Sequence, residues 1–308
     1  MERYFKATPT PHEESSSNVH IQSDPHELPN FHIEKNLPEL PSDPGLRPHI
    51  TLYDSNIRER VRRAYLLKGP CQPRNLEFRQ TLMGGGGFTS KHVYGSGYFR
   101  MSLKIPKNSK GITTSFYLSS AALKNQGYNH DELDFEFLGN NGPPYILNTN
   151  VFAQDSGHRE QQFKLWFDPT SDFHEYELLW NQNQIVFFVD KVPIRVFKNH
   201  KKNGARYPTL PMDVKTSLWN GTSWLGPVDW SKGPFLANYR GFEINGCPYE
   251  KSNPNQCYSS NYEWNAPKNW KLDSQQEKNY QNVRNKYLVY DYCKSKLANN
   301  FVECQFVE

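Results

Sequence analysis

The chain has 308 residues, and 36 Lys and Arg against 32 Asp and Glu give it a net charge of +4. This excess is too small, and its charges too interspersed, to indicate a nucleic-acid partner. No stretch approaches the roughly 18 uncharged apolar residues of a membrane-spanning helix, which argues against an integral membrane protein. Aromatic residues make up 14% of the sequence. So many large rings in a polar chain indicate a β-rich protein.

The N-terminal 45 residues are rich in Pro, Ser, Glu and His and show no apolar periodicity. We therefore predict that residues 1–45 are a disordered leader. Residues 1–17 lack the apolar stretch of a secretory signal peptide, so this end of the sequence provides no evident route to export.

Residues 46–82 differ in composition, and we assign them to a fragment rather than a complete domain. A short basic helix is expected over residues 57–67, because Gly69-Pro70 would end it. The run RRAYLLKGPCQP at 62–73 resembles the leader of TTF-type zinc-finger domains in transposase-like proteins. Cys71 has no neighbouring cysteine with which to form such a finger. We therefore expect no nucleic-acid partner.

From residue 83 onward the pattern is typical of an all-β protein. Short strands are predicted over residues 94–103, 112–118, 132–138, 146–152, 174–180, 185–189 and 194–197. Strands at this density without intervening helices favour a β-sandwich. One helix is expected near the C-terminus, where Ser274 and Glu277 have the spacing of a capping box.

Acidic and apolar residues alternate strictly from residue 132 to residue 137. In a strand this places Glu132, Asp134 and Glu136 on one face and the apolar residues on the other. Three neighbouring carboxylates repel one another, so a fold has little structural reason to build this face. Two alternatives are a solvated acidic strand and a calcium site. Calcium would need further oxygen ligands nearby, and the local spacing does not provide them.

The three acids suit glycoside hydrolysis with retention of configuration. That reaction needs one carboxylate as nucleophile and one carboxyl as acid/base, roughly 5–5.5 Å apart. Residues i and i+4 of a strand are about 13 Å apart at Cα, and side chains leaning inward over a curved sheet reduce the gap. A carboxylate between them helps keep one carboxyl protonated.

The run HDELDFEFLGN at 130–140 resembles the signature of the xyloglucan endotransglucosylase/hydrolase family of plant cell-wall enzymes, within family 16 of the glycoside hydrolases. The similarity continues through NTNVF at 148–152, GHREQ at 157–161 and SLWNGTSW at 217–224, and ends in NVRNKYLVYDYC at 282–293. It covers about 220 residues, from about Gly87 to the C-terminus.

The resemblance implies a curved, concanavalin A-like jelly-roll sandwich over residues 83–240 and a family-specific C-terminal extension over 241–308. Glu132 would be the nucleophile, Glu136 the acid/base, and Asp134 the residue that orients and tunes them. The enzyme would cleave the β-1,4-glucan backbone of xyloglucan and transfer it to a second xyloglucan chain or to water. We expect it to act without cofactor or metal, as a monomer in the cell wall.

The resemblance also implies which residues contact the substrate. Arg159 is one of them, and a salt bridge to Glu160 is an alternative role for it. Trp180, in the apolar context ELLW, is predicted to be core. Trp219 and Trp224 lie in a Gly-, Ser- and Asn-rich stretch, where we expect exposed rings that contact the sugar. The predicted substrate-binding residues are Asn148, Thr149, Asn150, Arg159, Glu160, Trp219, Trp224 and Gly226.

Four of the five cysteines lie after residue 246. Their spacing is typical of two local disulfides, which form in oxidising compartments. A four-cysteine zinc site is the alternative, but the sequence has no C-x₂₋₄-C pair. The resemblance pairs Cys247 with Cys257 and Cys293 with Cys304, which would staple the C-terminal extension.

Residues 46–82 stand where the resemblance places the first strands of the sandwich. We therefore expect a sandwich that lacks one or two strands, as a rearranged gene or a gene model joining two loci would produce. Because such a loss exposes core surface and ladder hydrogen-bonding groups, the alternative function is an inactive or weak glucan-binding protein.

Overall fold

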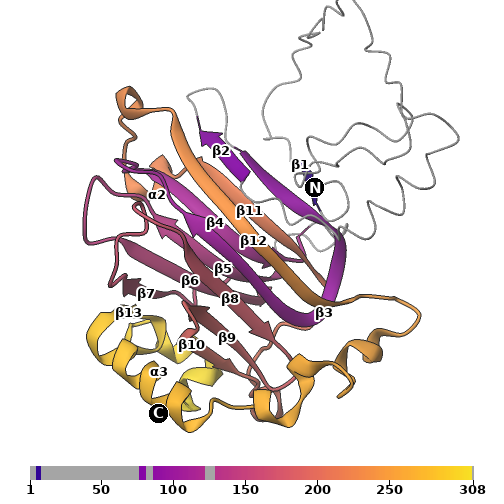
Figure 1. The fold of residues 1–308 in the computed structure, drawn as a ribbon. Coiled ribbons are helices and arrows are strands. Elements are labelled where there is room, and N and C mark those ends of the chain that lie inside the picture. The colour runs from indigo at the N-terminus through magenta and orange to yellow at the C-terminus, as the bar shows by residue number, and fades with distance from the viewer. Residues whose placement is uncertain (1–4, 8–75, 81–85, 122–128, 307–308) are drawn as a thin grey trace, which may run out of the picture. The chain divides into compact units, whose positions relative to one another are not determined.

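The structure is a computed structural model that describes residues 5–7, 76–80, 86–121 and 129–306. In these residues, antiparallel strands join into one curled 13-stranded sheet (Figure 1). The strands are β1 (Phe5–Ala7), β2 (Leu76–Gln80), β3 (Gly86–Lys104), β4 (Ile112–Ser119), β5 (His130–Leu138), β6 (Ile146–Asp155), β7 (Gln161–Lys164), β8 (His174–Trp180), β9 (Gln184–Val189), β10 (Val192–Lys198), β11 (Met212–Asn220), β12 (Phe235–Pro248) and β13 (Leu288–Asp291). The α-helices in this part of the chain are α2 (Thr222–Leu225) and α3 (Ser274–Tyr287).

The strand β3 joins the two layers of the curled sheet. Its N-terminal half pairs with β11, whereas its C-terminal half pairs with β8 and β12. The order along the sheet is β10-β9-β8-β3-β11-β4-β5-β6-β7-β13. The layer around β8 and β9 is thereby folded over the layer around β4, β5 and β6, which confirms the expected all-β curved sandwich.

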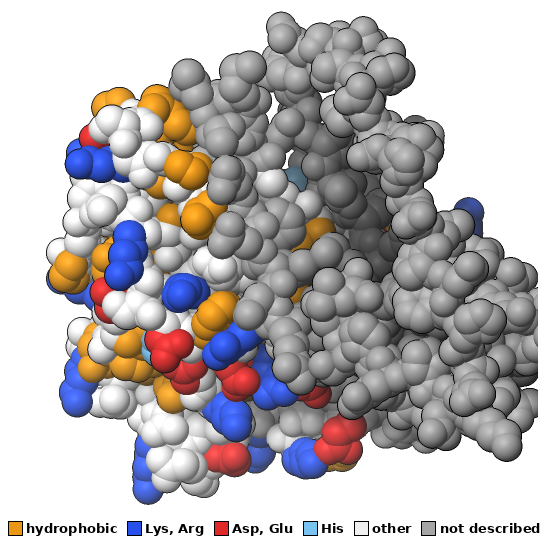
Figure 2. All heavy atoms as spheres, turned by 45° about the horizontal axis from the view of Figure 1, so that its top comes forward, with side chains coloured by type: hydrophobic (Ala, Val, Ile, Leu, Met, Phe, Trp, Pro, Cys, Tyr) orange, Lys and Arg blue, Asp and Glu red, His pale blue; other side chains and the backbone are white. Residues whose placement is uncertain are grey.

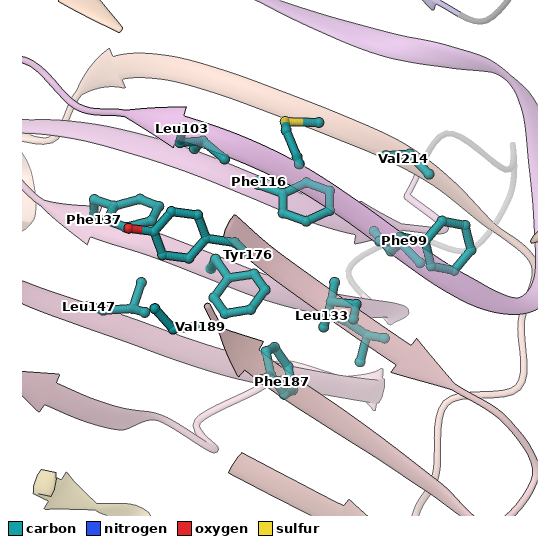
Figure 3. Packing of buried hydrophobic residues seen from close by; sticks show 14 of the residues in the cluster. Phe99, Leu103, Phe116, Leu133, Phe137, Leu147, Tyr176, Phe187, Val189 and Val214 are labelled. Atoms are coloured by element: carbon teal, nitrogen blue, oxygen red, sulfur yellow. The ribbon is translucent and has the colours of Figure 1, made fainter. Parts of the chain in front are cut away.

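Aromatic side chains fill the space between the layers. Phe135 lies with its ring centroid 5.2 Å from that of Phe187. The ring centroid of Phe137 lies 4.7 Å from that of Tyr176 (Figure 3). Each such burial contributes roughly 1.5–3 kcal/mol. Because the apolar face of β5 packs here, its acidic face is turned away from the core. Trp180 is buried as predicted.

Each of the seven predicted strands is present, most of them longer than expected. The sequence interpretation missed β7, β11, β12 and β13. In β12, Gly241 with φ +62° and Gly246 stand inside a 14-residue strand. A glycine in a sequence usually indicates a turn. Here Gly241 lies at the register shift between Arg240 and Glu243, and the strand continues through this irregularity.

Two described strands come from segments to which we assigned no part in the sheet. Strand β2, inside the 46–82 fragment, pairs with Phe235–Tyr239 of β12, and β1, inside the leader, pairs with Phe88–Ser90 of β3. The expected helix over 57–67 and the run that resembles a TTF-type leader lie outside the described residues.

The C-terminal extension is helical and carries both disulfides that the resemblance implied, Cys247–Cys257 and Cys293–Cys304. The predicted cap of its helix was wrong by one residue. Asp273, not Ser274, is the N-cap: its carboxylate accepts from the backbone N–H of Gln275 and Gln276. Gln276 in turn accepts from the Asp273 N–H at 3.0 Å.

Across the described residues, none of the helices has the length and apolar character needed to cross a bilayer. Figure 2 shows one face of the protein, on which basic, acidic and hydrophobic side chains alternate. This mixture matches the mild net charge of the sequence.

Candidate active site

The three acids of β5 point away from the core, as their alternation predicts. Pairing with β4 and β6 places polar neighbours on both sides. Asp134 lies between Tyr117 and Asn150, and Glu136 lies between Ser115 and Asn148. Residues directly opposite one another share a face of the sheet. The acids are therefore the centre of a polar surface that runs across three strands.

Asp134 is the most deeply buried of the three acids, with 4% of its surface exposed. Burial, and next the charges of Glu132 and Glu136, raise its pKa well above the ordinary value. It also forms a hydrogen bond with Glu132. A protonated Asp134 can donate that bond, which holds the Glu132 carboxylate in place. On its other side, Glu132 lies 3.3 Å from Nε2 of His130.

Glu136 has the proton affinity of an acid catalyst. Burial raises its pKa to about 7; the hydrogen bond from Asn148 Nδ2, at 3.0 Å, lowers it, and the charge of Glu132 raises it. A carboxyl with a pKa near 7 can give up a proton and take it back near neutral pH. Glu132 and Glu136 thus sit in different environments on one strand, which suits two different roles.

Strand β6 and the segment after it supply further polar groups beside Glu136. Asn150 Nδ2 lies 3.5 Å from Glu160 Oε1, while Asn150 Oδ1 accepts from the N–H of Arg159 at 3.0 Å. Asn148 is buried, and its Oδ1 has no hydrogen-bond partner among the described residues. That oxygen is an acceptor next to the acid, where a sugar hydroxyl would satisfy it.

Thr149, predicted to contact substrate, lies on the opposite face of β6. It is fully buried, donates to the backbone oxygen of Gln161 at 3.1 Å, and accepts from Arg195 at 3.0 Å. In a strand, adjacent residues alternate between faces, so Asn148 and Asn150 cannot share the cleft with Thr149. The geometry therefore supports a structural role for Thr149 in place of the predicted substrate contact.

Arg159 is 2% exposed and contacts protein groups. Its guanidinium lies 2.9 Å from Asp155 and 2.5 Å from Glu303, over the ring of Phe301. The partner is not Glu160, the residue named in the alternative interpretation. A guanidinium held in this way has no open face for a sugar, so the geometry supports a structural role instead of the predicted substrate contact.

The predicted tryptophans lie beyond the Leu138 end of the acidic row. Trp219 on β11 is half-buried and opposite Thr113, which is itself opposite Leu138. Trp224 on α2 is 45% exposed, and Gly226 follows that helix with φ +82°. The two tryptophan rings add aromatic area beside the polar surface. The apolar faces of sugars pack against such rings.

The sequence interpretation did not include several residues of this surface. Tyr117 and Ser115 of β4 share the face of the acids, and Ser115 Oγ lies 2.5 Å from Ser217 Oγ of β11. Alternation within the predicted strand over 112–118 would have placed both on one face. Only the pairing of β4 with β5 shows that Ser115 and Tyr117 share the face that carries Asp134.

The sequence comparisons agree with this geometry. The model of glycosyl hydrolases family 16 matches residues 60–232. Xyloglucan endotransglucosylase/hydrolase protein 3 of Arabidopsis thaliana is 50% identical over 231 residues, which are 71% of this chain and 77% of that protein. Protein 2 of the same plant is 47% identical over 234 residues, 73% of this chain and 78% of that protein.

Among solved structures, a prokaryotic β-1,3-1,4-glucanase from a mouse hindgut metagenome aligns with TM-score 0.46 and 23% identity, over 56% of this chain and 80% of its own. The family assignment rests on the match over residues 60–232 and on the two plant relatives. The chain belongs to the xyloglucan endotransglucosylase/hydrolase family, within family 16 of the glycosyl hydrolases.

Proposed function

We propose that this protein is a xyloglucan endotransglucosylase/hydrolase that works with retention of configuration. The observation that carries the proposal is the environment of β5: Glu136 has a pKa raised to about 7, and Asp134 lies between it and Glu132. The two Arabidopsis relatives, whose names describe this activity, are similar over most of their length. They supply the substrate class, which the geometry alone does not.

In the first step, the Glu132 carboxylate attacks the anomeric carbon while Glu136 gives its proton to the departing glycosidic oxygen. The glycosidic bond breaks, an ester bond to Glu132 forms, and the leaving chain departs with a new hydroxyl group. In the second step Glu136, now a carboxylate, takes the proton from an acceptor hydroxyl or from water. The acceptor oxygen then displaces Glu132 and restores the original configuration.

Substrate binding draws on the groups around the acids. The Asn148 oxygen, which has no partner in the described part of the chain, and the Glu160 carboxylate accept bonds from sugar hydroxyls. Asn150 orients Glu160. The exposed ring of Trp224 and the half-buried ring of Trp219 provide surfaces for the apolar faces of the sugars.

Glu132→Gln tests the nucleophile, because the amide keeps the shape of the side chain but cannot form the ester. We expect loss of at least a thousandfold in transfer of xyloglucan to fluorescent xyloglucan oligosaccharides, and the same loss in release of reducing ends. Xyloglucan binding measured by calorimetry should persist.

Glu250→Gln, on an exposed carboxyl outside this surface, is the matched control and should leave both activities unchanged. A wild-type chain that binds xyloglucan without any turnover would support the alternative of an inactive glucan-binding protein. Full activity in Glu132→Gln would reject the assignment of the nucleophile.

We further propose that the protein acts as a monomer in the cell wall. Its two disulfides support this compartment, because such bonds persist outside the cytosol. Light scattering after gel filtration should give the mass of one chain, and the protein extracted from cell-wall fractions should lack free thiols at these four cysteines.

A further inference from the structure

A cavity of about 580 Å³ lies between helix α3, strand β10 and the C-terminal segment Val302–Phe306. Helix α3 runs beside β10 in Figure 1. The volume is within the range of pockets that hold small ligands. None of the three acids of β5 lines it, and neither do the asparagines or tryptophans of the proposed cleft. The cavity is therefore separate from the catalytic surface.

Two buried hydrogen-bond acceptors line this cavity without a partner. Gln161 and Gln184 are 6% and 1% exposed, and the Oε1 atom of each has no partner among the described residues. The Gln184 amide is oriented by its Nε2, which donates to the backbone oxygen of Asn269 at 3.1 Å. Such oxygens are costly to leave unsatisfied, so the cavity suits an occupant that can donate hydrogen bonds.

The cavity also has an excess of positive charge. Four cationic side chains line it against two carboxylates, which leaves a surplus of two positive charges: Arg195, Lys198, Lys271 and Arg284 against Glu277 and Glu303. Glu303 already pairs with Arg159, Arg284 pairs with Asp291 at 2.9 Å, and Glu277 accepts from Gln281 at 2.9 Å. The lining cations without an ion-pair partner among the described residues are Arg195, Lys198 and Lys271.

Arg195 is the buried cation of this set, with 1% of its surface exposed. Its Nη atoms donate to the backbone oxygens of Thr149 and Arg159, and no carboxylate of the described residues lies within ion-pair distance. Lys198 and Lys271 are exposed and likewise form no ion pair with a described residue. Asp291 attracts Arg195 only from beyond ion-pair distance, and a buried cation without an ion-pair partner favours an anionic occupant.

We propose that this cavity binds an acidic sugar of the hexuronate class. Its carboxylate would neutralise the surplus positive charge, with Lys198 and Lys271 at the exposed side. Its hydroxyl groups would donate to the oxygens of Gln161 and Gln184. An inorganic anion without a hydroxyl group, such as sulfate, would leave these two acceptors unsatisfied, and a neutral sugar would leave the cations without a counter-charge.

The test uses the full chain and digalacturonate as the probe, with binding measured by calorimetry. We expect binding that weakens as salt is raised. Lys198→Ala and Lys271→Ala should each weaken it about tenfold, because each removes one cation from the lining. Lys278→Ala, on an exposed lysine of helix α3 that does not line the cavity, should leave binding unchanged.

Four other outcomes would overturn the proposal. Equal affinity for the neutral dimer of galactose would show that charge does not matter, and equal affinity for inorganic sulfate would show a simple anion site. Absence of digalacturonate binding to the wild-type chain would reject it directly. Displacement of digalacturonate by a xyloglucan oligosaccharide would assign the binding to the cleft instead. The Glu132→Gln results do not bear on any of these outcomes.

Discussion

At the scale of single residues, the acids of β5 show how environment separates identical chemical groups. Glu132 and Glu136 carry the same side chain, and burial of Glu136 raises its pKa to about 7. The sequence identified all three acids from their alternation. It could not assign proton affinities, because burial and the contact with Asn148 depend on strands that are distant in the chain.

The Glu136 proton also couples stability to pH. Its pKa is about 7 in the folded chain against an ordinary value of 4.5, so between these values the folded state binds more protons than the unfolded state. The free energy of unfolding therefore falls as pH rises through this window, and the contribution is fully present only below pH 4.5.

We expect Glu136→Gln to remove this dependence. Relative to the wild-type chain, the variant should gain about 1–3 kcal/mol of unfolding free energy between pH 4.5 and pH 7.5. Urea unfolding of both proteins at several pH values measures the difference, and Glu250→Gln serves as a control. Parallel curves for wild type and Glu136→Gln would contradict the pKa assignment.

At the scale of elements, the strands were predictable where alternation is strict and less so elsewhere. The sequence predicted the β5 strand from its alternation, whereas the glycines of β12 concealed a 14-residue strand. The sequence predicted helix α3, but the predicted N-cap, Ser274, is one residue after the observed one, Asp273. Both residue types are good N-caps. Only the geometry shows which side chain accepts the bonds from the first turn.

The Cys247–Cys257 disulfide joins the end of β12 to the segment Pro254–Tyr258, and both cysteines are buried. Closing a short loop reduces the freedom of the unfolded chain and contributes roughly 2–4 kcal/mol. The double variant Cys247→Ala/Cys257→Ala should lose about that amount in urea unfolding, while the Cys293–Cys304 pair still forms. Unchanged stability would mean that packing alone holds this segment.

At the scale of the whole described chain, the C-terminal extension completes the sheet. Strand β13 pairs with β7, and helix α3 packs on β10. The Arg159–Glu303 ion pair ties this extension to the segment that follows β6. The residues are 144 positions apart in the sequence, so no local pattern could pair them.

We expect Arg159→Met to be strongly destabilising, because it leaves the buried carboxylate of Glu303 without its counter-charge. The loss of unfolding free energy should be about 3–5 kcal/mol. The double variant Arg159→Met/Glu303→Leu should lose less, since neither charge then remains buried alone. Urea unfolding of the single and double variants provides the measurement, and a larger loss in the double variant would contradict this account.

The sequence by itself determined the all-β class, the family and the identity of the three acids, because these depend on periodicity and on a long contiguous motif. The tertiary structure decided which neighbours these acids have. It placed Thr149 in the core, Arg159 beside Glu303 and Asn148 beside Glu136. Alternation says which residues of one strand share a face, but the partner across the sheet depends on register, and register is set when distant strands pair and pack.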